Sequence, residues 1–434
     1  MNQHTAASKV FEQANKLAGF SAMKNGLTRA YLTEQHQQAH QQLAQWMKEA
    51  GLETWQDSVG NQWGRKVSAN PTQPTLIIGS HSDTVVNAGK YDGNLGILLG
   101  IEALNQLAGY VLPYHVDIVA FADEEGVRFD TTLIGSSAVA GCFSPAWLDI
   151  KDADNISMGE AMLSFGLSPE NAGTDSRSPQ ETLAYLEVHI EQGPVLENQD
   201  CAVGVVTGIA GAKRYLFDVY GMAGHAGTVP HELRNDALCG AAEMITAIEQ
   251  FGCQHDVVAT VGKCDVKPSA VNVIPGQVQF SLDIRSSDQQ TLLSACEVLR
   301  QELVTIADKR QLTLDERLIY QADAVPCSHV LQQQWADVIE CQTGQKACFL
   351  PSGAGHDAMV MANIADIGML FVRCEKGISH HPREQVLVED VEVALRCLVD
   401  MVSRGYAGSS TESNNPSSSM TRANTSEKVG SHND

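Results

Sequence analysis

Three short apolar segments of this chain are each followed at once by histidine or carboxylate residues, and this pattern most constrains the fold. The segments are rich in branched apolar residues, as buried strands are, and they cover residues 75–78, 116–121 and 183–188. In open α/β sheets, binding sites form beyond the carboxyl ends of the strands. We therefore expect the polar residues that follow the three segments to meet at one edge of a sheet.

These polar residues are of the types that bind divalent metals. His81 follows the first segment, Glu124 and Glu125 follow the second, and His189 follows the third. Imidazole nitrogens and carboxylate oxygens are common ligands of divalent metal ions. Asp83, two residues after His81, is expected to accept the second ring N–H of that histidine and so fix its tautomer.

Asp92 and His380 complete the expected set. Asp92 lies in a turn before an apolar helix, where Gly93 and Gly96 allow close backbone approach. This position suits a carboxylate that bridges two metal ions. A site for two divalent metals is therefore one hypothesis, in which one carboxylate of the Glu124–Glu125 pair binds metal and the other accepts a proton.

Simpler interpretations of the same residues stay open. A buried histidine is most often a structural hydrogen-bonding group, and an Asp-Glu-Glu run is most often a solvated loop. Competing catalytic motifs are absent: the sequence has no Gly-x-Ser-x-Gly, His-Glu-x-x-His, Walker or Gly-x-Gly-x-x-Gly motif. Spacing alone does not decide between a metal site and these structural roles.

The length of 434 residues favours two or three domains. Strand-like and helix-like stretches alternate, which is typical of an α/β fold. Between residues 212 and 320 the order becomes βαββαβ, typical of a ferredoxin-like unit. We expect strands at 214–220, 257–264, 278–285 and 312–318, and helices at 236–251 and 289–309.

We therefore expect a discontinuous di-metal catalytic domain with an inserted ferredoxin-like domain that acts as a lid and in dimerisation. The catalytic domain would comprise residues 1–211 and 321–404, and the insertion residues 212–320. Residues 405–434 consist mainly of small polar residues, which predicts a disordered tail.

Composition excludes several classes of partner. Lysine and arginine number 29 against 52 acidic residues, a net charge of −23, so binding to nucleic acid or an anionic membrane is not expected. The 11 cysteines contain no Cys-x-x-Cys pair, which argues against zinc ribbons, redox motifs and disulfide frameworks. The sequence shows no secretory signal and no apolar run of membrane-spanning length. Scattered free thiols are typical of a reducing compartment, so a cytoplasmic protein is predicted.

Several longer motifs resemble those of one enzyme family. Residues 79–84 (Gly-Ser-His-Ser-Asp-Thr), 91–93 (Tyr-Asp-Gly), 122–126 (Ala-Asp-Glu-Glu-Gly) and 377–382 (Gly-Ile-Ser-His-His-Pro) are similar to metal-site signatures of the M20 metallopeptidase superfamily. Residues 189–194, 224–228, 272–276 and 351–357 resemble more narrowly its amidohydrolase branch. That branch holds allantoate amidohydrolases, N-carbamoyl-L-amino acid hydrolases and β-ureidopropionases.

The resemblance implies a role for each metal-site residue. By this likeness His81 and His189 bind one metal ion, Glu125 and His380 bind the other, and Asp92 bridges both. Glu124 becomes the general base, and His381 is expected not to bind metal. The metal of this branch is commonly manganese, and zinc remains open because mixed N and O ligation suits either.

The resemblance also implies residues that bind a small carboxylate substrate. Arg285 matches the position that holds the substrate carboxylate, which a guanidinium can bind through two hydrogen bonds. The other matching positions are Gln192, Asn272, Gly353 and Gly355. His225 matches a residue that polarises the scissile carbonyl from the neighbouring subunit, which implies a homodimer.

Allantoate, cleaved to ureidoglycine, ammonia and carbon dioxide, is the expected substrate. This expectation comes from the resemblance, because three stretches are similar to those of plant-like allantoate amidohydrolases: residues 208–211, 267–276 and 368–374. N-Carbamoyl-L-amino acids and N-carbamoyl-β-alanine are the alternatives. Two other classes stay open, a peptidase of the same superfamily and a catalytically inactive binding protein of the same fold.

Overall fold

The computed structural model describes residues 6–405 and divides into two compact units. Unit 1 comprises the described residues up to Thr207, then Cys327–Leu350 and those from His356 onward. Unit 2 comprises Gly208–Pro326 and Pro351–Gly355. The last of these segments lies within the range that the sequence assigned to the catalytic domain. Most of the expected tail, residues 406–434, lies outside the described part of the chain.

The larger sheet runs in the order β1-β2-β4-β3-β5-β16-β6-β14, with β15 also paired to β6. Its central strands β3, β4, β5 and β16 are parallel to their neighbours in this group. The strand bounds are β1 (Glu53–Gln56), β2 (Gln62–Lys66), β3 (Thr75–His81), β4 (His115–Phe121), β5 (Thr182–Ile190), β6 (Val203–Ile209), β14 (Val325–Pro326), β15 (Cys348–Ser352) and β16 (Ile367–Val372). The three strands expected from sequence are confirmed as β3, β4 and β5.

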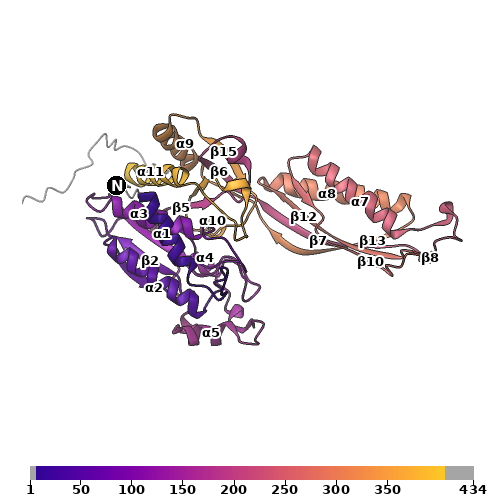
Figure 1. Ribbon diagram of the computed structural model, residues 1–434, viewed down its shortest axis with the longest axis horizontal. Coiled ribbons are helices and arrows are strands. Elements are labelled where there is room, and N and C mark those ends of the chain that lie inside the picture. The colour runs from indigo at the N-terminus through magenta and orange to yellow at the C-terminus, as the bar shows by residue number, and fades with distance from the viewer. Residues whose placement is uncertain (1–5, 406–434) are drawn as a thin grey trace, which may run out of the picture. The chain divides into compact units, whose positions relative to one another are not determined.

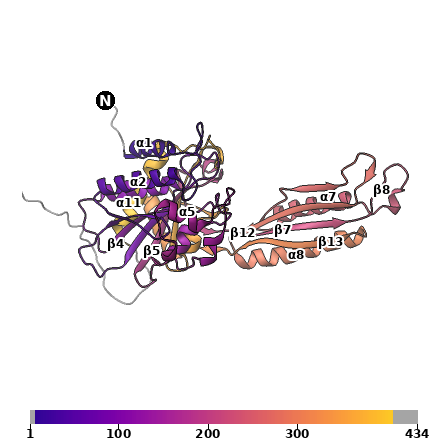
Figure 2. The same ribbon diagram turned by 90° about the horizontal axis from the view of Figure 1, so that it is seen from below.

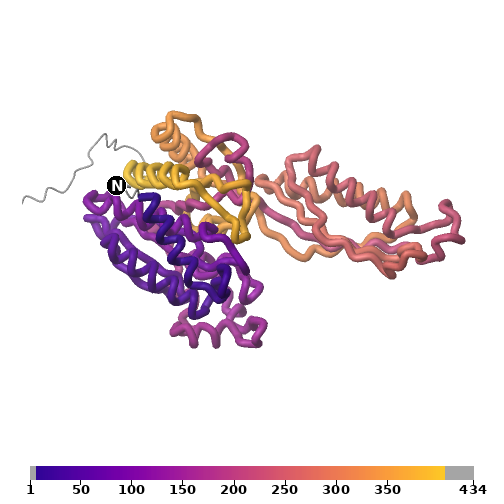
Figure 3. The backbone as a smooth tube through the Cα atoms, viewed as in Figure 1, coloured from indigo at the N-terminus to yellow at the C-terminus, as the bar shows by residue number. Residues whose placement is uncertain are grey.

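Helices pack around the larger sheet in unit 1. The longer ones are α1 (Ala6–Ala18), α2 (Glu34–Glu49), α3 (Asn94–Gln106), α9 (His329–Thr343) and α11 (Val388–Arg404). Shorter ones are α4 (Ile134–Val139), α5 (Met158–Phe165), α6 (Val195–Asn198) and α10 (Ala358–Met361), with 3-10 turns at Pro145–Asp149, Pro169–Asn171 and Glu375–Gly377. The first and last helices, α1 and α11, lie side by side (Figure 3), where Ala7 N donates to Glu392 Oε2 at 3.2 Å.

Helix α3 is the central helix of this core. Its residues from Asn94 to Leu104 are all buried, and it packs on β3, β4 and β5. Such a helix is apolar nearly all round because it is covered on all sides. Its first turn follows Asp92 directly, so the packing of α3 fixes the position of that carboxylate.

Unit 2 has a separate antiparallel sheet in the order β10-β12-β7-β13, with β9 also paired to β12. The strands are β7 (Gly211–Tyr220), β9 (Val258–Thr260), β10 (Cys264–Lys267), β12 (Gln277–Ser286) and β13 (Thr313–Ala322), and β8 (Gly224–His225) pairs with β11 (Val273–Ile274). A 3-10 turn covers His231–Leu233. Figure 2 shows β12, β7 and β13 running alongside one another.

Two helices, α7 (Ala237–Gln254) and α8 (Gln289–Lys309), cover one face of this sheet (Figure 1). Buried and partly exposed residues alternate along β12, as expected for a strand with one covered face. The prediction of one continuous strand at 257–264 is wrong, because the structure has two short strands there, β9 and β10. β9 and β10 pair with different parts of β12, and between them Lys263 N donates to Ser281 Oγ at 3.0 Å.

None of the helices within residues 6–405 combines the length and apolarity of a membrane span.

Candidate metal centre

Three imidazoles surround the carboxylate of Asp92. Asp92 Oδ1 lies 3.4 Å from His81 Nε2 and 3.2 Å from His189 Nε2. The other oxygen, Oδ2, lies 3.2 Å from His380 Nε2, which is also 3.5 Å from Glu125 Oε1. Each oxygen of Asp92 therefore faces a different set of ligand atoms.

The described residues thus contain two overlapping groups of possible ligand atoms with Asp92 in common. His81, Asp92 and His189 form one, and Asp92, Glu125 and His380 form the other, each with its ligand atoms within 4.8 Å of one another. Mixed nitrogen and oxygen donors suit first-row divalent cations. The donor set fits two such ions that share the Asp92 carboxylate.

Glu124 belongs to a neighbouring group with His81 and Glu125. His381, in contrast, is exposed, belongs to none of these groups, and its Nδ1 accepts from Arg383 N at 3.1 Å.

The strand register and one glycine bring these residues together. His81 is the last residue of β3, His189 lies one residue before the end of β5, and the two strands are parallel. Gly93 has φ +65°, and a Cβ built there would lie 2.5 Å from His81 Cδ2. Its N–H also points to His189 Nε2 at 3.2 Å. A side chain at this position would displace His81, which explains the glycine.

Asp92 is held by residues that the sequence reasoning missed. Glu384 Oε1 accepts from the backbone N–H groups of Tyr91 at 2.8 Å and Asp92 at 3.1 Å. Ser379 Oγ donates to Asp92 Oδ2 at 2.8 Å and to Glu384 Oε2 at 3.1 Å. Such outer contacts orient metal-binding carboxylates. Ser379 stands next to His380 in its motif, which is the one signal that could have identified it.

Asp83 has a different main partner from the one expected. His81 Nδ1 lies 3.2 Å from the backbone oxygen of Asp83 and 3.4 Å from its Oδ1. The two carboxylate oxygens accept from the backbone N–H groups of Glu124 at 3.0 Å and Glu125 at 3.1 Å. Asp83 therefore fixes both the histidine and the turn that carries the two glutamates.

The electrostatics of the cluster favour added positive charge. Burial opposes charging of the His81 ring, but hydrogen bonds to Asp83 and Asp92 outweigh it and hold its pKa well above the usual value. Burial raises the pKa of Glu124 well above its usual value, and that of Glu125 to about 7. Cations near these groups would favour the ionised carboxylates.

Two site residues hold a left-handed backbone that side chains rarely adopt. Gln192 has φ +58° and His380 has φ +54°. Gln192 Nε2 donates to Asp92 Oδ2 at 3.0 Å, so the unusual backbone serves a contact to the cluster. Strain of this kind, on the order of 1–3 kcal/mol per residue, concentrates at functional sites.

A further buried polar layer lies behind His189. Glu187, His189 and His356 form another group with ligand atoms within 4.8 Å, and the rings of His189 and His356 meet edge to face at 4.6 Å. Asp357 is fully buried, which raises its pKa well above the usual value. His356 and Asp357 belong to the Gly-His-Asp run at residues 355–357, which could have indicated them, but their spacing in the sequence did not predict a role for either.

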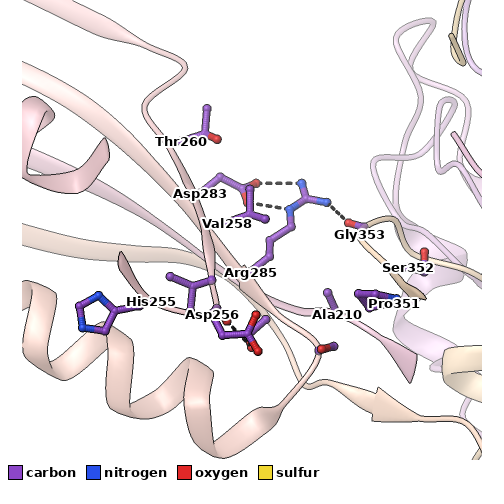
Figure 4. Close-up of a pocket in the computed structure, with 13 residues that line it drawn as sticks. Ala210, His255, Asp256, Val258, Thr260, Asp283, Arg285, Pro351, Ser352 and Gly353 are labelled. Carbon is purple, nitrogen blue, oxygen red and sulfur yellow. Dashed lines mark hydrogen bonds and ion pairs between the residues drawn. The ribbon is translucent and has the colours of Figure 1, made fainter. Parts of the chain in front are cut away.

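The remaining expected residues lie in unit 2, in two groups. Arg285 Nη1 donates to Gly353 O at 2.6 Å, in the wall of a cavity of about 490 Å³ (Figure 4). Gly355 ends the short segment that carries Gly353. His225 is exposed on β8 and pairs with Val273, and Ala226 N donates to Asn272 O at 3.0 Å. The structure thus joins Arg285 with Gly353, and His225 with Asn272.

A family model described as "Peptidase family M20/M25/M40" matches residues 77–404, which include all the metal-site residues above. The chain belongs to this family. Enzymes of the family depend on metal ions, in agreement with the donor groups around Asp92.

Relatives narrow the activity to non-peptide bonds. An N-carbamoyl-L-amino acid amidohydrolase of Geobacillus stearothermophilus is 40% identical over 380 residues, covering 87% of this chain and 93% of the relative. An allantoate deiminase of Arabidopsis thaliana is 39% identical over 427 residues, covering 91% and 81%. A hydantoinase/carbamoylase family amidase of Burkholderia multivorans superposes with a TM-score of 0.85 at 30% identity, covering 92% and 97% of the two chains. This M20 protein is a hydrolase acting on linear C–N bonds other than peptide bonds.

Proposed function

We propose that this M20 hydrolase cleaves the ureido group of allantoate to give ureidoglycine, ammonia and carbon dioxide. The observation that carries the hydrolytic reaction is the Asp92 carboxylate, whose two oxygens face separate imidazole groups. The choice of allantoate rests on the similarity of residues 208–211, 267–276 and 368–374 to the corresponding stretches of plant-like allantoate amidohydrolases. N-Carbamoyl-L-amino acids are the second candidate, supported by the relative that is 40% identical, and N-carbamoyl-β-alanine is the third.

In this proposal two divalent ions, manganese before zinc, are bound by five residues: His81, Asp92, Glu125, His189 and His380. Ions bound there would activate water and polarise the ureido carbonyl. Glu124 is the general base, which accepts a proton from the attacking water and delivers it to the leaving nitrogen. Its raised pKa and its place beside His81 and Glu125 support this role.

Substrate binding is assigned to Gln192, Asn272, Arg285, Gly353 and Gly355. Arg285 holds the substrate carboxylate, and its hydrogen bond to Gly353 O supports a shared place for the two in the site. Gln192 supports the assignment through its contact to Asp92. A second ureido arm needs polar partners, so a site built for allantoate would reject analogues that lack this arm.

Unit 2 is proposed to be a ferredoxin-like lid that also forms a homodimer. Its strand order and its two helices on one face support the ferredoxin-like fold. Edge strand β13 supports the homodimer, because Leu318, Ile319 and Tyr320 are 46%, 52% and 42% exposed. Apolar side chains on an unpaired edge favour strand-to-strand association. His225 then polarises the carbonyl in the partner's site, and the free thiols support a cytoplasmic location.

A substrate panel tests the activity. Purified enzyme loaded with Mn²⁺ is assayed for ammonia release from allantoate, N-carbamoyl-L-amino acids and N-carbamoyl-β-alanine, and for cleavage of dipeptides. We expect turnover of allantoate with little on the others. Turnover of carbamoyl-amino acids without allantoate would replace the first candidate by the second, and cleavage of dipeptides alone would contradict both.

Mixing two inactive variants tests the role of His225 across subunits. Glu124→Ala and His225→Ala should each be nearly inactive alone. In an equal random mixture about half the dimers are mixed, and each mixed dimer has one site with both residues intact, so about a quarter of the wild-type activity should return. A mixture as inactive as its parents would place His225 in the site of its own chain.

A further inference from the structure

Arg285 is part of a line of charged and aromatic side chains across the sheet of unit 2. On β12, Asp283 accepts from Arg285 Nε at 2.7 Å and from Nη2 at 3.0 Å (Figure 4). On β7, Arg214 stands directly opposite Asp283 and donates to its Oδ2 at 2.8 Å. On β13, the ring of Tyr320 lies 4.5 Å from the Arg214 guanidinium. On β12, Asp283 and Arg285 alternate with the buried residues that pack against α7 and α8, and the strand register places Arg214 and Tyr320 on the same open face as Asp283.

Within residues 6–405, hydrogen bonding occupies three of the N–H donors of Arg285. A guanidinium has five N–H donors. Asp283 takes two of them on the Nε edge, and Gly353 O takes one on Nη1. The two that remain, one on each terminal nitrogen, are the pair that an incoming carboxylate can accept.

The charges of this line leave room for one anion. Arg214 and Arg285 carry two positive charges, and Asp283 carries one negative charge. Burial acts to raise the pKa of Asp283, but hydrogen bonds from Arg285 and Arg214 together outweigh it and hold the pKa below its usual value, so Asp283 stays ionised. These three side chains therefore have a net charge of +1, which favours binding of an anion beside Arg285, although Asp256 adds a negative charge to the wall of the same cavity.

We infer that Asp283, itself held by Arg214, is a positioning residue that fixes the Arg285 guanidinium for the carboxylate of the substrate. The inference rests on the proposed function in one respect, the assignment of Arg285 to the substrate carboxylate. Asp283 does not touch the substrate. It keeps a long, partly exposed side chain in the orientation that binds.

Two effects of Asp283 on substrate binding oppose each other. Its negative charge repels a carboxylate, whereas its hydrogen bonds hold Arg285 in place. Arg285 and Asp283 have side chains 32% and 28% exposed, so solvent weakens the repulsion. We therefore expect the orienting effect to dominate.

Asp283→Glu separates the two effects, because it keeps the charge and moves the carboxylate by one methylene. With allantoate as substrate, KM should rise about three- to tenfold, the loss expected when one flexible side chain is released, while kcat changes less than about twofold. A counter-ion without an orienting role would leave KM unchanged in Asp283→Glu and lower it in Asp283→Asn. That result would overturn the inference.

Asp265→Glu is the matched control. Asp265 lies on β10 on the same sheet face and forms an ion pair at 3.0 Å with Lys263, also two residues away. The side chains of Asp265 and Lys263 are each more than half exposed, and neither residue belongs to the proposed site. The KM of Asp265→Glu should equal that of the wild type.

A double variant separates this inference from the proposed function. Asp283→Glu should change KM little further in an Arg285→Lys background, because it acts through the guanidinium. A rise in KM for Arg285→Lys but none for Asp283→Glu would overturn the positioning role alone. An unchanged KM for Arg285→Lys would remove Arg285 from the substrate site. It would overturn both the assignment of Arg285 to the substrate carboxylate and the positioning role of Asp283.

Crystal structures supply a readout that needs no turnover. The wild type should show one ordered Arg285 rotamer bonded to Asp283, and Asp283→Glu should show several rotamers or a displaced guanidinium. An Arg285 that keeps its orientation in Asp283→Glu would contradict the inference whatever the substrate is.

Discussion

The two larger sheets, one in each unit, differ in how they are covered. In unit 1 every residue of β3 and β4 is buried, as both faces are packed. In unit 2 only alternate residues of β12 are buried, and most of edge strand β13 is exposed. Parallel strands covered on both faces read as continuous apolar runs, and a half-covered antiparallel sheet reads as an alternation.

This difference separates two kinds of functional position. In unit 1 polar residues lie where the strands end, and the packing of the strands and of α3 holds His81 and His189 within 3.4 Å of the Asp92 carboxylate. In unit 2 polar residues lie along an open face, where Asp283 and Arg214 must orient Arg285 through ion pairs. We therefore expect substitutions at the strand ends of unit 1 to change kcat, and those of Asp283 and Arg285 on the open face of unit 2 to change KM.

The largest expected effect is on kcat, from Glu124→Gln. The change removes the proton acceptor and leaves the five metal ligands in place. General-base catalysis contributes about 10²–10⁴-fold, so kcat should fall by that factor while KM stays within a few-fold. Steady-state kinetics with metal analysis of the purified protein checks this, and a loss below tenfold with metal retained would disprove the role.

Neighbouring residues on β12 test the covered and open faces of unit 2. Phe280 is fully buried on the helix side, and Phe280→Ala should lower the free energy of unfolding by about 3–5 kcal/mol. Gln279 lies on the open face and bonds to Asp218 at 3.0 Å, so Gln279→Ala should cost about 1 kcal/mol or less. Urea denaturation compares the two, and equal costs would contradict a sheet covered on one face only.

The open face should act on substrate affinity through Arg285. In Arg285→Lys, the lysine keeps the positive charge but cannot present two parallel N–H groups to a carboxylate. Losing a charge-assisted hydrogen bond, about 1.5–3 kcal/mol, predicts a KM about 10- to 150-fold higher with kcat little changed. A fall in kcat alone would assign Arg285 to the chemical step and break the division between the two units.

The packed interior of unit 1 should also shape the dependence of stability on pH. His40 is buried beside His36, with ring centroids 4.0 Å apart, and burial and then Arg29 lower its pKa from 6.5 to about 3. Between these pH values the unfolded chain binds one proton more than the folded chain at this residue. The free energy of unfolding therefore decreases as pH falls below 6.5, by about 1.4 kcal/mol per pH unit from His40.

The test compares thermal or urea unfolding of wild type and His40→Gln between pH 7 and pH 5. The variant should show the smaller loss of stability on acidification. His231→Gln, at an exposed histidine of unit 2, should behave as the wild type does. Equal pH dependence in His40→Gln and wild type would show that His40 does not contribute.

The sequence alone determined β3, β4 and β5 and the residues that follow them. His81, Glu124 and His189 were identifiable because an apolar run ending in ligand residues is a local pattern, and the parallel arrangement brings such ends together. The longer motifs likewise identified the family, since each is a contiguous stretch of sequence.

Only the tertiary structure decided which polar groups hold these residues in place. Ser379 and Glu384 reach Asp92 from almost 300 residues away, and Asp83 bonds to the N–H groups of Glu124 and Glu125 instead of chiefly orienting His81. In unit 2 the register of β7 and β12 places Arg214 opposite Asp283, and the same pairing splits the strand expected at 257–264. These contacts depend on how distant segments pack and on strand register, and neither leaves a period or a spacing in the local sequence.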